Sequence, residues 1–141
     1  MRTKLLDSGT RFIAQVLAGE TLPINCMYVE YGPSPETTVH DVSADYFNDI
    51  EDGGKRGFAR IAVTNISVDG NKLTFFGMLT TDDFVGNAPS KNSYLTTVTI
   101  ANSKDNNRQN DTLIMTSVIG ADTKVIKGAY TTVCVSMEIG L

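Results

Sequence analysis

The residue types that most often carry enzymatic chemistry are scarce in this sequence and lie far apart. The one histidine, His40, stands in a polar Thr-Val-His-Asp context, which is typical of a surface residue. The two cysteines, Cys26 and Cys134, lie in strand-like apolar runs, where a thiol usually serves as a small buried hydrophobe. No phosphate-binding glycine loop, no Gly-x-Ser-x-Gly turn and no His/Cys cluster with metal spacing occurs in the sequence. We therefore expect a protein that is not an enzyme, with no catalytic and no cofactor-binding residues.

Carboxylates gather in one segment, residues 36–57, which makes calcium the metal to consider. An EF-hand loop needs an oxygen ligand two residues before Asp52, but Ile50 stands there. We expect no metal site, and interpret the segment as a solvated acidic connection in which a helical turn presents Tyr46, Phe47 and Ile50.

Length, composition and charge narrow the class of protein. The chain has 141 residues, of which 41% are hydrophobic and 20% charged, and its net charge is −4. This length predicts a single domain over residues 1–141, since a domain usually has about 100–200 residues. A negative charge without a Lys/Arg cluster argues against a nucleic-acid partner, and no apolar run approaches the ~18 residues of a membrane span. The N-terminal MRTKLLDSGTRF reaches Asp7 after two leucines, so we also expect no signal peptide.

The stretch from Phe58 to Leu79 consists of two alternating runs joined by Asp69-Gly70. Alternation with period two is typical of a strand, and Asp-Gly between such runs predicts a β-hairpin with a type I′ turn. Both faces of each arm carry apolar residues, so we expect this hairpin to be the centre of a sheet.

A short amphipathic helix is predicted near the N-terminus. Asp7 or Ser8 can cap its start, an apolar stripe follows at helical spacing, and Gly19 supplies the stop. A helix of about three turns is not stable alone, so its stripe must dock on the sheet or on a neighbouring subunit.

Four further strands are predicted from alternating or continuous apolar runs, at residues 22–31, 94–101, 113–119 and 130–139. Strands and helices do not alternate as a parallel sheet would require. The predicted fold is therefore mostly β: an antiparallel sandwich or open barrel of about six main strands, with one short N-terminal helix.

The order of these features is more informative than any single motif. The opening LLDSGTRFIAQVLAGETLPINCMYVEYGPSP resembles the start of bacteriophage tail-fibre and baseplate attachment domains, in which an Ala/Leu-rich helix ending in Ala-Gly precedes a strand and a glycine-rich turn. The residues that match are Leu6, Gly9, Ile13, Leu17, Ala18, Gly19, Pro23, Ile24, Val29 and Gly32. In outline the resemblance continues to a loop with Phe84 and Gly86 and an Ile126-x-Gly128 hook before the last strand.

No fibre shaft follows this region, so we expect a free-standing virion component: a capsid decoration (cement) protein or a tail or baseplate adaptor. The resemblance implies that its partners are other virion proteins, namely the major capsid protein or tail and baseplate proteins. It also implies a homo-oligomer, with a trimer favoured, located in the virion after assembly in the host cytoplasm. From pattern alone, the candidate interface residues are Phe12, Val16, Tyr46 and Phe47.

The alternative function is a carbohydrate- or ligand-binding β-domain. Sugar binding needs exposed aromatic rings for stacking, but the chain has no tryptophan and five tyrosines distributed along strands and the acidic connection. We expect those tyrosines to pack in the core instead.

Overall fold

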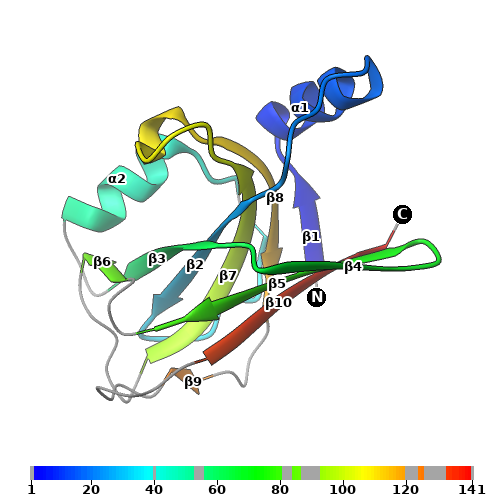
Figure 1. Cartoon of the computed structure of the whole chain (residues 1–141). Helices are drawn as coiled ribbons and strands as arrows, with labels where there is room; N and C mark the ends of the chain where they lie inside the picture. Colours follow the sequence, from blue (N-terminus) through cyan, green and yellow to red (C-terminus); the bar gives the residue numbers. More distant parts are fainter. Residues whose placement is uncertain are drawn as a thin grey trace.

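The computed structural model shows two antiparallel β-sheets and two short helices, and it describes residues 2–39, 41–52, 56–80, 84–86, 93–119, 124–125 and 133–140 (Figure 1). The larger sheet has the order β1-β8-β7-β2-β3-β6, and β9 also pairs with β7; the smaller sheet has the order β10-β5-β4. The elements are β1 (Arg2–Leu5), α1 (Asp7–Leu17), β2 (Cys26–Gly32), α2 (Ala44–Asp52), β3 (Gly57–Ala62), β4 (Asn65–Asp69), β5 (Lys72–Leu79), β6 (Phe84–Gly86), β7 (Ser93–Asn102), a 3-10 turn (Arg108–Asn110), β8 (Thr112–Val118), β9 (Lys124–Val125) and β10 (Val133–Gly140). The mostly β, antiparallel fold predicted from the sequence is confirmed.

Strand β2 lies at the centre of the larger sheet, between β3 and β7, and all of its residues are buried. Its side chains alternate between two cores: Met27 and Val29 point into one, Cys26 and Tyr28 into the other. The prediction of two apolar faces for this strand is confirmed. β2, rather than the Asp-Gly hairpin, is the central element of the fold.

The predicted hairpin exists, but its first arm is divided between the two sheets. β3 belongs to the larger sheet and β4 to the smaller, with Val63 and Thr64 between them. Asp69 pairs with Lys72, so the loop residues are Gly70 and Asn71, one position later than expected. Gly70 has φ +61° and no other residue of the described hairpin has a positive φ, which is the pattern of a type II′ rather than a type I′ turn.

The smaller sheet packs on the larger one where β5 crosses β3. A side chain at Gly77 would bring its Cβ within 2.8 Å of Ile61 Cδ1, so glycine permits this close approach. Phe75, Met137 and Ile139 of the smaller sheet complete the core that Met27 and Val29 enter from the larger one. The two sheets thus form a sandwich along part of their length.

Helix α1 begins at Asp7 and ends at Leu17, followed by Gly19 at φ +101°, so the predicted helix and its stop are confirmed. The predicted cap is wrong: Leu6 is the N-cap residue and no side chain caps the helix, because Asp7 lies in the first turn and the Ser8 hydroxyl donates to the carbonyl of Leu113. The helix packs on β8 through Gly9 and Phe12, and the backbone N–H of Leu6 donates to the carbonyl of Ile114 at 2.9 Å. Strand β1, which was too short to be recognised from pattern, pairs with β8 on the edge of the larger sheet.

Helix α2 confirms the helical turn predicted within the acidic connection. It covers the face of the larger sheet opposite the smaller sheet, and Phe47 and Ile50 are buried there (Figure 1). The Phe47 ring lies 4.6 Å from that of Tyr28 and 4.9 Å from that of Phe58, measured between centroids. This aromatic cluster is the second core.

Candidate functional site

A buried carboxylate, Glu30, lies on the α2 side of the sheet. Its side chain accepts hydrogen bonds from Arg56 Nη2 at 2.5 Å, Tyr46 Oη at 2.5 Å and Thr97 Oγ1 at 2.6 Å. Burial, with the neighbouring Glu30 charge, raises the pKa of Tyr46, so its hydroxyl remains a donor. The buried charge is compensated within the chain, as a carboxylate without water requires.

A second buried carboxylate, Asp111, lies at the far end of β2. Arg60 binds it through two hydrogen bonds, Nε to Oδ2 at 2.7 Å and Nη2 to Oδ1 at 2.9 Å, and the Tyr28 hydroxyl also donates to it. The thiol of Cys26 lies 4.0 Å from the same carboxylate, and burial raises its pKa to about 11. The Cys26 side chain is 4% exposed, so the prediction that it lies buried is confirmed. A thiol that keeps its proton is also a poor nucleophile. The side chain of Cys134 lies outside the described residues.

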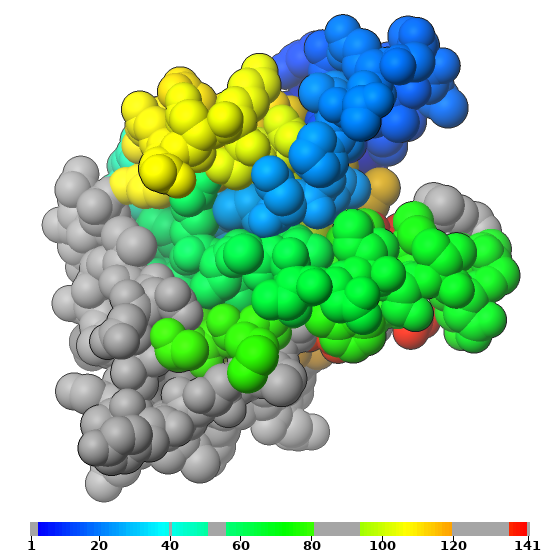
Figure 2. Space-filling model, viewed as in Figure 1, coloured from blue at the N-terminus to red at the C-terminus, as the bar shows by residue number. Residues whose placement is uncertain are grey.

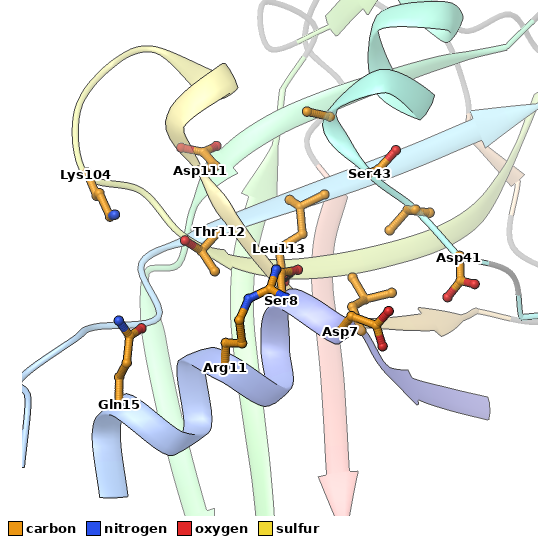
Figure 3. A pocket seen from close by; sticks show the side chains of 13 residues that line it. Asp7, Ser8, Arg11, Gln15, Asp41, Ser43, Lys104, Asp111, Thr112 and Leu113 are labelled. Atoms are coloured by element: carbon orange, nitrogen blue, oxygen red, sulfur yellow. Dashed lines mark hydrogen bonds between the residues drawn. The ribbon is translucent and has the colours of Figure 1, made fainter. Parts of the chain in front are cut away.

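A polar cleft of about 660 Å³ opens between the start of α1, residues 41–44 and residues 111–113 (Figure 3). Arg11 and Lys104 bring positive charge to it, Asp7 and Asp41 negative charge. The Ser8 hydroxyl donates to the carbonyl of Leu113 rather than to a base.

The chemistry available to this cleft is limited. Asp111 borders it, but its carboxylate is already held by Arg60. His40 lies outside the described residues, and among the described residues that line the cleft there is no histidine or cysteine. Among the residues that the structure describes, no three His, Cys, Asp or Glu side chains are grouped so as to hold a metal ion. The described lining of the cleft therefore presents mixed charge, with the Asp111 carboxylate paired to Arg60 and the Ser8 hydroxyl bound to a backbone carbonyl.

The second hollow, which we call the apolar groove, has a volume of about 320 Å³ and lies between α1 and the inner face of the smaller sheet. Every residue that lines it is hydrophobic: Phe12, Ile13, Val16, Leu17, Ile24, Leu73, Phe75, Ile100, Ile114, Met115 and Ile139. Figure 2 shows why it is open: α1 and the β4–β5 hairpin project from the same side of the molecule with a recess between them.

The apolar surface continues beyond the groove. Leu17, at the end of α1, is 82% exposed. On the hairpin, Ile66 pairs with Phe75 and Val68 with Leu73, so all four side chains lie on the inner face, yet Ile66 is 45% and Val68 69% exposed. Monomeric proteins rarely leave contiguous apolar surface of this kind uncovered, so the groove is the candidate binding site.

The candidate interface residues fall on two separate regions. Phe12 forms the floor of the groove and Val16 part of its wall. Tyr46 and Phe47 lie on α2, where Tyr46 binds Glu30 and Phe47 is 1% exposed in the aromatic core. The structure does not bring the two pairs together. For all four residues, a role at an interface stays a prediction. Because Phe47 is buried, it can contribute to an interface only by holding α2 in place.

Sequence reasoning missed the strand residues of the groove, notably Leu73, Met115 and Ile139, and its exposed extension at Ile66 and Val68. One feature of the sequence could have indicated the exposed extension: the alternation of Asn-Ile-Ser-Val-Asp places both large hydrophobic residues of β4 on one face of the strand.

Comparisons of the chain with protein-family models, with curated proteins and with solved structures found no match. Neither of the helices described is long and apolar enough to cross a membrane. In the part of the chain that the structure describes, fold and site define a two-sheet β-protein whose buried side-chain polar atoms have hydrogen-bond partners and which has an open apolar groove.

Proposed function

We propose that this chain is a non-enzymatic structural component of a bacteriophage virion. It binds other virion proteins as a capsid decoration (cement) protein or as a tail or baseplate adaptor. The major capsid protein or the tail and baseplate proteins are its partners, and the assembled virion is its location.

The observation that carries this proposal is the apolar groove. A groove lined only by hydrophobic side chains and bordered by exposed Leu17 and Val68 gains free energy by burying apolar side chains of another protein. It lies beside α1, where the sequence resembles phage attachment domains.

The polar groups of the chain support a structural rather than a catalytic role. Among the described residues, Glu30 and Asp111 have buried carboxylates, and each is paired with an arginine of the same chain. A carboxylate that is held by an arginine in this way is not available as a general acid or base.

The proposal is tested first by quantitative mass spectrometry of particles from the source, separated into heads and tails. A copy number near that of the major capsid protein in the head fraction supports a decoration protein, and a low copy number in the tail fraction supports an adaptor. Absence from both fractions refutes the virion assignment.

Binding to particles then tests the groove itself. Leu17→Glu places a charge at the exposed mouth of the groove, where folding tolerates it, and we expect it to abolish retention of the purified protein on particles. Ala14→Glu is the matched control, because Ala14 is exposed on the same helix but does not line the groove. Equal retention of both variants would exclude the groove as the contact.

The alternative, a ligand-binding β-domain, is favoured by one feature: the volume of the groove reaches the lower limit of small-molecule sites, about 300 Å³. Such sites add a few polar groups that orient the ligand, and this lining has none. Tyr28 and Tyr31 are buried and cannot stack on a sugar. A glycan array that gives binding with the folded protein would favour the alternative.

A further inference from the structure

Strand β4 forms an uncovered edge of the smaller sheet. All five of its residues are exposed, and among the described strands it pairs with β5 alone. Its sequence, Asn-Ile-Ser-Val-Asp, contains neither a proline nor a lysine, the residues with which proteins commonly protect an edge from another strand. This edge is therefore open to strand addition.

The register of the hairpin identifies the backbone groups that are free. In a two-residue hairpin the residues flanking the loop, here Asp69 and Lys72, form a hydrogen-bonded pair. Alternation along an antiparallel pair then directs the N–H and C=O groups of Ile66 and Val68 away from β5. Two donors and two acceptors thus line the outer edge.

We propose that β4 pairs with β4 of a second copy of this chain, antiparallel and about a two-fold axis at Ser67. The backbone groups of Ile66 then meet those of Val68 in the other copy, which is the pairing that antiparallel geometry requires. The result is a continuous six-stranded sheet built from two three-stranded ones.

The sequence of β4 is complementary to itself in this register. Ile66 lies opposite Val68 on the inner face, so that four exposed apolar side chains cover one another. On the outer face Asp69 lies opposite Asn65, whose amide can donate to the carboxylate, and no like charges meet. Such isologous pairing is the common form of a two-fold interface, and it would form whether or not the chain belongs to a virion.

The contact is tested by cysteine cross-linking combined with measurement of mass in solution. Ser67 faces its own copy in a non-hydrogen-bonded pair with a Cα separation of about 4.5 Å, within the range of a disulfide. We expect Ser67→Cys to give a covalent dimer on mild oxidation. Asp69→Cys is the matched control: it lies two residues from the axis, so its two copies are roughly 13 Å apart and cannot be bridged. Wild-type protein, oxidised in parallel, shows any dimer formed through the native cysteines.

Sedimentation equilibrium over a concentration series supplies the second readout. Val68→Lys introduces a charge twice into each dimer at an exposed position, and we expect dimerisation to weaken on the order of tenfold or more. Met78→Lys, which is exposed on the outer face of β5 and away from the edge, leaves the dimer unchanged. A monomer at all concentrations, a trimer without a two-fold contact, or a dimer that neither cross-links through residue 67 nor responds to Val68→Lys would overturn the proposal.

Discussion

Alanine in place of Gly9 sets two physical effects of opposite sign against each other. In an exposed helix, alanine is more stable than glycine by about 0.5–1 kcal/mol, because glycine loses more backbone entropy on folding. Gly9, however, faces β8, where an added Cβ would lie 2.0 Å from the carbonyl oxygen of Ile114. Real Cβ contacts essentially never fall below 3.0 Å, so α1 would have to retreat from β8.

The cost of that retreat exceeds the gain in helix propensity. Overpacking against rigid backbone costs about 1–3 kcal/mol, and the Leu6 N–H to Ile114 C=O hydrogen bond at the same junction is worth about 1 kcal/mol. We expect Gly9→Ala to lower the free energy of unfolding by about 1–3 kcal/mol and the Tm by roughly 3–10 °C.

Urea unfolding followed by circular dichroism measures this change. Thr10→Ala is the control: Thr10 is exposed on the same helix, so alanine there changes propensity without a clash, and its effect should stay within about 0.5 kcal/mol. If Gly9→Ala is as stable as the wild type or more stable, α1 does not pack on β8 as closely at Gly9 as the structure indicates.

Three further predictions concern the second core and the buried polar groups beside it. Asp111→Ala leaves the Arg60 guanidinium without its carboxylate partner, and we expect the free energy of unfolding in urea to fall by about 3–5 kcal/mol. A double variant that also carries Arg60→Met should recover part of this loss, and a double variant no more stable than Asp111→Ala would contradict this account. Burial raises the pKa of the Cys26 thiol from its ordinary value of 9.0 to about 11. The unfolded state therefore loses this proton at a lower pH than the folded state, and the free energy of unfolding falls as the pH rises from about 9 to about 11. Between pH 8 and 11, the Tm of the Cys26→Ala variant should decline less than the Tm of the wild type. If the Tm of both proteins falls equally with pH, the raised pKa of Cys26 is refuted. By chemical denaturation, Phe47→Ala should lower the free energy of unfolding by about 3–5 kcal/mol, and Phe76→Ala, at an exposed site, by no more than about 1 kcal/mol. Similar losses for the two variants would show that α2 does not cover a core.

Local pattern was sufficient for the elements whose residues alternate or repeat without interruption. The two faces of β2, the presence of α1, its end before Gly19 and the hairpin between β4 and β5 all follow from side-chain period and from turn chemistry. These features depend on residues close in the chain, which is why sequence alone predicts them.

The features that were missed depend on residues distant in the chain. The first arm of the hairpin alternates without a break, so nothing local indicates that it leaves one sheet for the other near Thr64. Likewise, Glu30 of β2 meets Arg56, which precedes β3, and Asp111, which precedes β8, meets Arg60 of β3, only because segments distant in the sequence lie together. The apolar stripe of α1 could be predicted, but the divergence of α1 from the smaller sheet, which makes the groove, could not.

The pairing of β1 with β8 has a consequence for the order in which the chain acquires structure during synthesis. The surface on which residues 2–17 dock is made by residues 112–118, which leave the ribosome about a hundred residues later. At a synthesis rate of about 5–20 residues per second, the hydrophobic stripe of α1 remains without its partner strand β8 for roughly 5–20 s. During that interval the nascent chain presents this stripe to chaperones and to neighbouring chains, so the yield of folded protein should depend on translation speed and on chaperone supply.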